Sequence, residues 1–356
     1  MVSRRTFVAG AAFGVACLVN EGALAATSSA RKVIAPPKLK PGDTVAIVSP
    51  AGAATSAADL EATRAALETK LGVHAVLAPN SAAQWGYLAG SDEGRADDFN
   101  WAVNNPDVDA IITLRGGYGT MRMIPHIDYD AFRRNPKIVT GYSDITGLLN
   151  ALTARSGVIT FHGPIAESKY TGFEREWFDK AVTVAQPIGK LGTPATISGR
   201  VVEPAPRTIQ AGKATGRLVG GNLSLIAACA GTPYLPSFKH AILVLEDTNE
   251  DPYRVDRMLT TLHLHGMLGQ LAGIVFGDFR PPKPQPVDPA APPPDKKREF
   301  SMDQVIDNLC QWVKCPIFTG LYAGHISDKL TLPIGAMAAM DADLKELVVT
   351  ESAVSA

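Results

Sequence analysis

The sequence predicts an α/β protein, with an amino-terminal, mainly parallel sheet carrying helices on both faces and a smaller α/β carboxyl-terminal domain. Apolar, strand-like runs alternate with amphipathic, helix-like runs over 43–165, and a second alternation begins at residue 216. The chain has 356 residues, 46% of them hydrophobic, which is enough for more than one core. These observations favour two domains.

The amino-terminal alternation, 43–165, is predicted to be the first domain. Gly72 ends one helix-like run and Ser91 is a good cap for the next. Strands are expected at 44–52, 74–79, 109–115, 137–142 and 157–164, and helices at 56–72, 91–105 and from 145 onward. Strands separated by helices pair in parallel, so their carboxyl ends are expected to share one edge of the sheet.

The rest of the chain is less regular. Residues 166–215 are predicted to connect the domains, and 216–352 to form the second one. A strand and a helix are expected within 216–236, then strands at 240–247, 271–279 and 316–321, helices at 252–268 and 301–313, and a hairpin at 337–351. Eight of the fourteen residues in 281–294 are proline, which predicts an exposed, extended loop.

The first 26 residues resemble an export signal. A basic start with the pair Arg4-Arg5 precedes an apolar run, and small residues follow at 23–25. This pattern indicates a signal peptide of the twin-arginine type, with an ordinary secretory signal or an uncleaved anchor as alternatives. We therefore expect a periplasmic protein without stable membrane insertion after cleavage, in which 27–42 is a linker.

Composition bears on partners and cofactors. Lys and Arg number 34 against 35 Asp and Glu, giving a net charge of −1, and no basic block predicts nucleic-acid binding. Three cysteines remain after cleavage (Cys229, Cys310 and Cys315), an odd number without a CxxC pair. Since no zinc-binding motif occurs either, we expect neither a metal nor an organic cofactor.

Ser143 stands where a strand-like run meets a helix-like run, in the sequence GYSDIT. A serine at such a corner is exposed at the sheet edge, beside amides that can stabilise an oxyanion. The pattern is not G-x-S-x-G, however, and serine is also a preferred helix cap. The local residues leave both interpretations open, and by themselves favour the cap.

The segment LRGGYGT, 114–120, follows the third predicted strand. Its three glycines permit a close approach to a ligand, but they match neither the mononucleotide nor the dinucleotide fingerprint. The segment lies at the same predicted edge as Ser143 and is a candidate second source of an oxyanion amide. Arg115 is a candidate for binding a substrate carboxylate, and an exposed ion pair is the alternative.

A serine nucleophile needs a base and an acid that orients it. Among seven histidines, His325 lies in a glycine-flanked loop, the kind of segment that often carries catalytic groups. Glu246 follows a fully apolar strand and needs a partner if it is buried. A histidine would satisfy it, and so would Arg254 or Arg257.

Several motifs occur together and in order along the chain. They are GDTVAIVSPAG (42–52), GYLAGSDEGRADDFN (86–100), LRGGYGTMRMI (114–124), GYSDITGLL (141–149), FHGP (161–164), GRLVGGNLSLIAACAGTPYLP (216–236), LVLEDTNEDPYRVDRML (243–259) and GHISDKLTLPIG (324–335). In this respect the sequence resembles the LD-carboxypeptidases, serine peptidases that include the microcin C immunity peptidases.

The resemblance implies Ser143 as nucleophile, Glu246 as acid and His325 as base. It also implies an oxyanion hole formed by the backbone amides of Gly117 and Asp144. Substrate contacts are further expected from Arg115, Gly116 and Tyr118. Family members are often dimers, so a homodimer is expected.

The implied reaction removes the terminal D-alanine from peptidoglycan-derived tetrapeptides. Two alternatives are a microcin-type peptidase that cleaves an aminoacyl-nucleotide conjugate and a wall-peptide binding protein without catalysis. The chain departs from the family in its long proline-rich segment and in its export signal, because familiar relatives act in the cytoplasm. Here the muropeptide substrate would be met in the periplasm.

Overall fold

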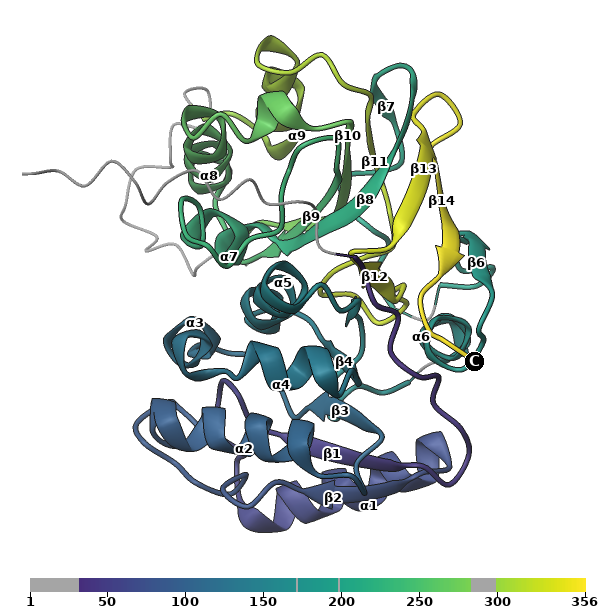
Figure 1. The fold of residues 1–356 in the computed structure, drawn as a ribbon. Helices are drawn as coiled ribbons and strands as arrows, with labels where there is room; N and C mark the ends of the chain where they lie inside the picture. The colour runs from purple at the N-terminus through teal and green to yellow at the C-terminus, as the bar shows by residue number, and fades with distance from the viewer. Residues whose placement is uncertain (1–31, 171, 198, 283–298) are drawn as a thin grey trace, which may run out of the picture. The chain divides into compact units, whose positions relative to one another are not determined.

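The computed structural model describes residues 32–170, 172–197, 199–282 and 299–356. Residues from Val33 to Ala356 form one compact unit (Figure 1). The predicted signal peptide and most of the predicted proline-rich loop lie outside the described residues. Among the residues that are described, no helix is long and apolar enough to cross a membrane.

The first sheet has six strands in the order β12-β5-β4-β3-β1-β2. Five of them pair in parallel: β1 (Thr44–Val48), β2 (His74–Leu77), β3 (Ala110–Thr113), β4 (Ile138–Gly141) and β5 (Thr160–His162). The sixth, β12 (Leu332–Ile334), comes from near the end of the chain and pairs with β5 in the antiparallel direction. The expected parallel sheet is present, and it is completed by a late segment that the sequence did not reveal as a strand.

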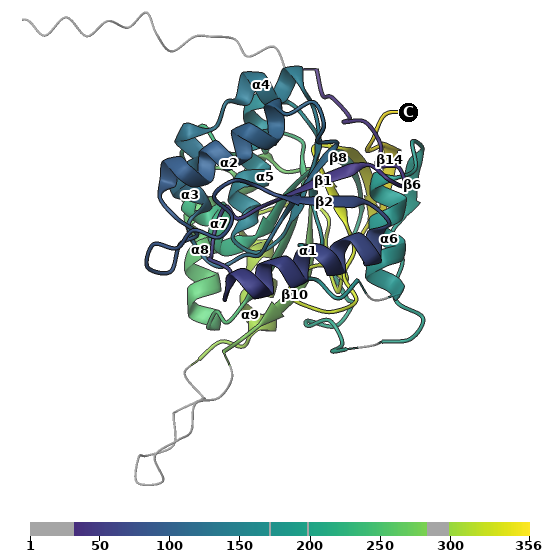
Figure 2. The ribbon, with the colours of Figure 1, turned by 90° about the horizontal axis from the view of Figure 1, so that it is seen from below.

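Helices cover both faces of this sheet (Figure 2). They are α1 (Ala57–Leu71), α2 (Asp92–Asn104), α3 (Thr120–Met123), α4 (Tyr129–Arg134), α5 (Ile145–Ser156) and α6 (Gly172–Val182), with a 3-10 turn at Ile124–His126. Side chains along β1 point alternately to the two faces of the sheet. Val45 and Ile47 pack in the core that contains α1 and α6. Ala46 and Val48 pack in the core that contains α2, α4 and α5. The strand is thus buried on both sides, as its continuous apolar run predicts.

The second sheet is mixed and has eight strands in the order β6-β14-β13-β8-β9-β10-β11-β7. Its parallel centre is β8 (Lys213–Asn222), β9 (Ile242–Thr248), β10 (Gly273–Arg280) and β11 (Ile317–Thr319). Antiparallel strands flank it: β6 (Pro187–Lys190), β7 (Thr208–Gln210), β13 (Met337–Asp341) and β14 (Glu346–Ser352). The predicted α/β class with two sheets is confirmed.

One face of the second sheet packs under α7 (Leu223–Ala228), α8 (Pro252–Leu264) and α9 (Met302–Asn308), the last two followed by 3-10 turns at Leu268–Gln270 and Leu309–Gln311. Its other face shares a core with the first sheet: Leu218 and Val244 belong to the same cluster as Val45 and Phe178. The two sheets therefore share a continuous apolar core.

The segment predicted as an inter-domain connection, 166–215, contains α6, β6 and β7. The two strands are short edge strands whose exposed or half-buried residues show no clear alternation, so periodicity did not reveal them. The predicted helix 301–313 is interrupted, since regular α-helix ends at Asn308. The domain boundaries themselves stay predictions.

Candidate active site

Ser143 occupies a sharp corner between β4 and α5. Its φ of 64° lies in the left-handed region, which non-glycine residues seldom adopt outside special sites. The helix begins after it, with Asp144 at the N-cap position and no side-chain capping bond. The structure therefore does not use the Ser143 hydroxyl as a helix cap, and that interpretation is set aside.

The glycine-rich segment after β3, residues 116–119, lies in close contact with this corner. A Cβ placed on Gly116 would lie 2.9 Å from the Ser143 Cβ and 3.2 Å from its Oγ. Gly117 has a φ of 121°, a conformation that L-residues rarely adopt. Glycine is therefore favoured at position 116 by the close approach to the serine, and at position 117 by the backbone conformation.

Hydrogen bonds fix the segment to the start of α5. The Thr120 amide donates to Asp144 Oδ2 at 2.9 Å, and the Thr120 hydroxyl donates to the Asp144 carbonyl at 2.6 Å. From the other side, the buried Arg95 guanidinium donates to the carbonyls of Gly119 and Pro50. Burial raises the pKa of the Asp144 carboxyl. Asp144 thus connects the two stretches of backbone from which oxyanion amides are predicted.

Glu246 of the second sheet and His325 of the loop between β11 and β12 form a close pair. Glu246 lies near the end of β9 and is fully buried, and its Oε2 is 2.8 Å from His325 Nδ1. Burial alone raises the pKa of Glu246, but the neighbouring His325 and His162 outweigh it and lower the pKa to about 2. Burial lowers the pKa of His325, but the negative charge and hydrogen bond of Glu246 raise it by more, so the net shift of the pKa is upward.

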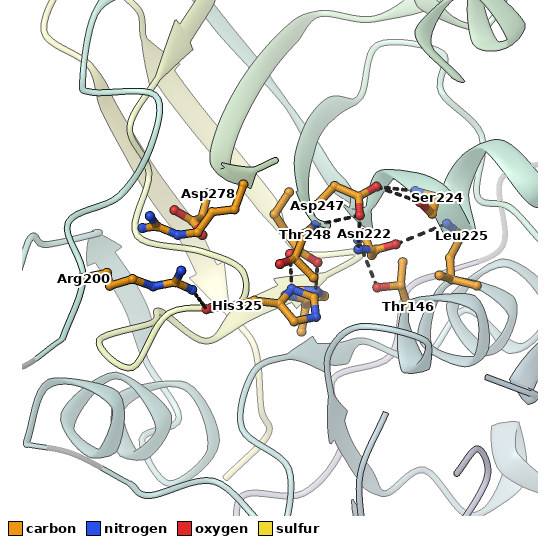
Figure 3. Close-up of polar contacts among 12 residues, drawn as sticks. Thr146, Arg200, Asn222, Ser224, Leu225, Asp247, Thr248, Asp278 and His325 are labelled. Carbon is orange, nitrogen blue, oxygen red and sulfur yellow. Dashed lines mark hydrogen bonds and ion pairs between the residues drawn. The ribbon is translucent and has the colours of Figure 1, made fainter. Parts of the chain in front are cut away.

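The alternative partners of Glu246 lie elsewhere. Arg254 pairs with Glu250 at 3.7 Å, and Arg257 lies over the ring of Tyr253. The acid next to Glu246, Asp247, accepts bonds from Asn222, Ser224 and Thr248 instead (Figure 3). Of the partners that the sequence left open for Glu246, the structure shows a histidine, His325.

Aromatic packing holds the imidazole of His325. The Tyr142 ring meets it edge to face, with ring centroids 5.1 Å apart. Lys329 Nζ lies 4.3 Å from the centroid of the Tyr142 ring. The same nitrogen is 2.9 Å from Oε1 of the buried Glu174. Tyr142 precedes Ser143, so the nucleophile corner and the histidine loop touch each other through this ring.

A pocket of 580 Å³ opens at this place. Ser143 and His325 both line it, together with Gly116, Gly117 and Arg115. Arg115 Nε lies 3.3 Å from Glu167 Oε2, a second side chain of the pocket wall. Further lining residues that the sequence did not single out are Gln84, Tyr87, Tyr142 and Glu167.

Two predicted features are arranged less directly. The Tyr118 side chain is 52% exposed and packs edge to face on Tyr87 at 5.6 Å, rather than lining the pocket itself. Within the described chain, no hydrogen bond joins Ser143 to His325. Such bonds commonly tighten only when substrate binds. The catalytic roles of all these residues stay predictions.

In the described part of the chain, no three His, Cys, Asp or Glu side chains gather as a metal site. Cys229, Cys310 and Cys315 are free thiols. Cys310 and Cys315 pack against the core of the second sheet. The polar groups that line the pocket include hydroxyl, phenol, imidazole, carboxylate, carboxamide and guanidinium groups and backbone amides.

This combination of a strained serine and a carboxylate-bound histidine around one pocket is the equipment of a hydrolase. Comparison with known proteins specifies which kind. The LD-carboxypeptidase N-terminal domain matches residues 45–163, and the LD-carboxypeptidase C-terminal domain matches residues 215–340. The chain belongs to the LD-carboxypeptidase family, and is a peptidase.

Individual relatives agree with this. A probable murein peptide carboxypeptidase of Bacillus subtilis is 34% identical over 88% of this chain and 93% of its own length. Among solved structures, muramoyltetrapeptide carboxypeptidase from Oxalobacter formigenes has a TM-score of 0.72 and 28% identity, covering 88% of this chain and 100% of its own. The structure of MccF in complex with glutamyl sulfamoyl guanosine has a TM-score of 0.78 and 26% sequence identity. It covers 90% of this chain and 100% of its own.

Proposed function

We propose that the protein is a serine LD-carboxypeptidase that removes the terminal D-alanine from peptidoglycan-derived tetrapeptides. The observation that supports the proposal is that one pocket is lined both by Ser143, which follows β4 of the first sheet, and by His325, which is bonded to Glu246 of the second sheet. Relatives named as murein peptide carboxypeptidases support this substrate class.

In the proposed reaction, Ser143 Oγ attacks the carbonyl carbon of the peptide bond while His325 takes the hydroxyl proton. Glu246 keeps the imidazole in the required tautomer and stabilises its charged form. The amides of Gly117 and Asp144 bind the oxyanion. His325 then protonates the amine of D-alanine, the C–N bond breaks, and water, activated by the same imidazole, releases the peptide from the acyl-enzyme.

The pocket offers contacts for a zwitterionic peptide. Arg115 lines the pocket and would bind a carboxylate, with Gly116 beside it and Tyr118 in edge-to-face contact with Tyr87 of the pocket wall. Glu167 supplies negative charge next to Arg115, suited to an ammonium group of a diamino acid. We also propose export by the twin-arginine route to the periplasm and a homodimeric assembly, as the sequence predicts.

The test is chromatography of a muropeptide tetrapeptide after incubation with enzyme. Ser143→Ala is expected to lower tripeptide release at least about 1000-fold. The matched control is Ser237→Ala, which removes an exposed hydroxyl in a loop and should leave the rate unchanged. Equal release by wild-type and Ser143→Ala protein would overturn the assignment.

A second candidate is a peptidase that cleaves aminoacyl-nucleotide conjugates, favoured by the fold similarity to MccF. Turnover of an aminoacyl sulfamate in preference to the tetrapeptide would support it. Saturable binding of both compounds without turnover by the wild-type protein would instead indicate a binding protein.

A further inference from the structure

The Glu246 carboxylate has a second imidazole neighbour that the reaction above does not use. His162, the last residue of β5, is 1% exposed, and its Nε2 lies 3.6 Å from Glu246 Oε1. His325 approaches the other oxygen, Oε2. The carboxylate is therefore placed between a pocket-facing histidine and a buried one.

His162 Nε2 and Glu246 Oε1 are both buried, and in the described part of the chain neither has a hydrogen-bond partner. A buried polar atom without a hydrogen bond is unfavourable, because it has lost its bonds to water. The 3.6 Å gap is longer than a hydrogen bond, which spans about 2.7–3.2 Å, and too short to hold a water between the atoms. Within the described residues, a small approach of these two atoms would therefore give each of them a hydrogen-bond partner.

Glycines lie close to both members of this pair. A Cβ on Gly221 would lie 2.8 Å from His162 Cδ2, and a Cβ on Gly324 would lie 2.9 Å from Glu246 Oε2. Both glycines have positive φ, 123° and 120°. Backbone without side chains therefore borders the imidazole of His162 and the carboxylate of Glu246.

The two groups belong to different sheets. His162 is fixed by pairing with Gly141 of β4 and Leu332 of β12, whereas Glu246 pairs with Asn222 in the second sheet. The β12 strand follows the His325 loop directly along the chain. A bond from His162 to Glu246 would hence connect Glu246 of the second sheet to the first sheet. The first sheet carries Ser143, and its strand β12 follows the His325 loop.

We propose that His162 is a positioning residue, which donates its Nε2 proton to Glu246 Oε1 and thereby keeps Oε2 aligned with His325. The inference rests on the proposed function for its effect on turnover. His162 itself touches no pocket surface, and it acts on the reaction only through the carboxylate.

The electrostatic consequence has a definite sign. The charged groups that influence His325 are Glu246, Asp247 and Lys329. Without the donor at Oε1, the carboxylate keeps more of its negative charge for His325, so the pKa of His325 rises. A group that merely fills space would not change this titration.

The decisive pair of variants is His162→Gln and His162→Met. The two side chains have similar size, but only glutamine carries a donor close to the position of Nε2. We expect His162→Met to lower kcat about 10- to 100-fold, with KM nearly unchanged, and to move the acid limb of kcat/KM to higher pH. His162→Gln should stay within about fivefold of wild type, with an unmoved limb.

Folding is checked by the thermal midpoint of each variant, and a double-mutant cycle separates lost positioning from a general loss of stability. In a Glu246→Gln background, His162→Met should lower kcat no further, because the carboxylate that His162 serves is gone. Equal losses for the Gln and Met variants, or an unmoved acid limb in His162→Met, would overturn the proposal.

A readout without turnover separates this inference from the proposed function. In Ser143→Ala protein, the imidazole of His325 is titrated by NMR, with and without His162→Met. The expected result is a higher pKa with the methionine, whether or not the protein cleaves tetrapeptides. An unchanged pKa contradicts the positioning role even if the peptidase assignment is correct.

Discussion

The first sheet and the second sheet contribute to the pocket in different ways. The glycine-rich segment 116–119 follows β3, and Ser143 follows the neighbouring parallel strand β4. Both therefore lie at the carboxyl edge of the sheet, where open α/β sheets bind ligands. Glu246 and His325 are 79 positions apart in the second half of the chain. The nucleophile half is thus a local product of strand–helix alternation, whereas the acid–base half depends on long-range pairing.

A polar seam holds the two halves together. Buried Asn150 of α5 donates to the Gly220 carbonyl at 2.8 Å and accepts from the Gly220 amide at 3.3 Å. Thr146, one turn earlier, accepts from the Asn222 amide at 3.0 Å (Figure 3). The helix that follows the nucleophile is therefore bonded to the strand beside the one that carries Glu246.

Among the tests of this comparison, the largest effect is expected from filling the space next to the nucleophile. Gly116→Ala would bring a Cβ to 2.9 Å from that of Ser143 and displace the serine or the segment. We expect kcat to fall about 100-fold with the fold intact, because small misplacements at a reacting centre have effects of this size. Gly269→Ala, where a Cβ meets nothing within 4 Å, is the control. Wild-type kcat in Gly116→Ala would show that the close approach has no catalytic role.

The seam is tested through stability. Asn150→Ala leaves the buried Gly220 amide and carbonyl without their partner, so we expect the free energy of unfolding to fall by about 2 kcal/mol. Asn104→Ala in α2 is matched to it, since exposed Asn104 bonds only within its own helix. Chemical denaturation measures both. A loss for Asn150→Ala no greater than that for Asn104→Ala would mean that the shared apolar core alone joins the sheets.

The pH dependence separates the two roles of the Glu246–His325 pair. Because Glu246 raises the pKa of His325 above 6.5, kcat/KM should fall about tenfold per pH unit on the acid side of a midpoint above 6.5. Stability runs the opposite way, since the charged imidazole stabilises the fold below its unfolded pKa and this contribution is lost as pH rises through the folded pKa.

The acid of the pair has its own window. The pKa of Glu246 is lowered from 4.5 to about 2, so its carboxylate stabilises the fold above pH 4.5, and this contribution is lost as pH falls towards 2. Denaturation midpoints across pH 2–9 measure both trends, and Glu246→Gln should flatten them. An acid limb centred below pH 6 would contradict the raised pKa of His325.

The sequence was informative where structure follows from local pattern. The alternation over 43–165 predicted the five parallel strands of the first sheet, because buried parallel strands are continuous apolar runs. The apolar run before Glu246 predicted a buried carboxylate in need of a partner. The sequence did not reveal β12, which is a three-residue strand containing a proline, or the short edge strands β6 and β7.

By itself, then, the sequence determined the α/β class, the order of the motifs and the candidate residues Ser143, Glu246 and His325. Only the tertiary structure decided that Ser143 is in a left-handed conformation instead of capping α5, and that Glu246 chooses His325 over two arginines. It also placed His162 behind the carboxylate. The reason is that periodicity reports which face of an element is buried, whereas contacts between residues distant in the chain arise only when the two sheets pack.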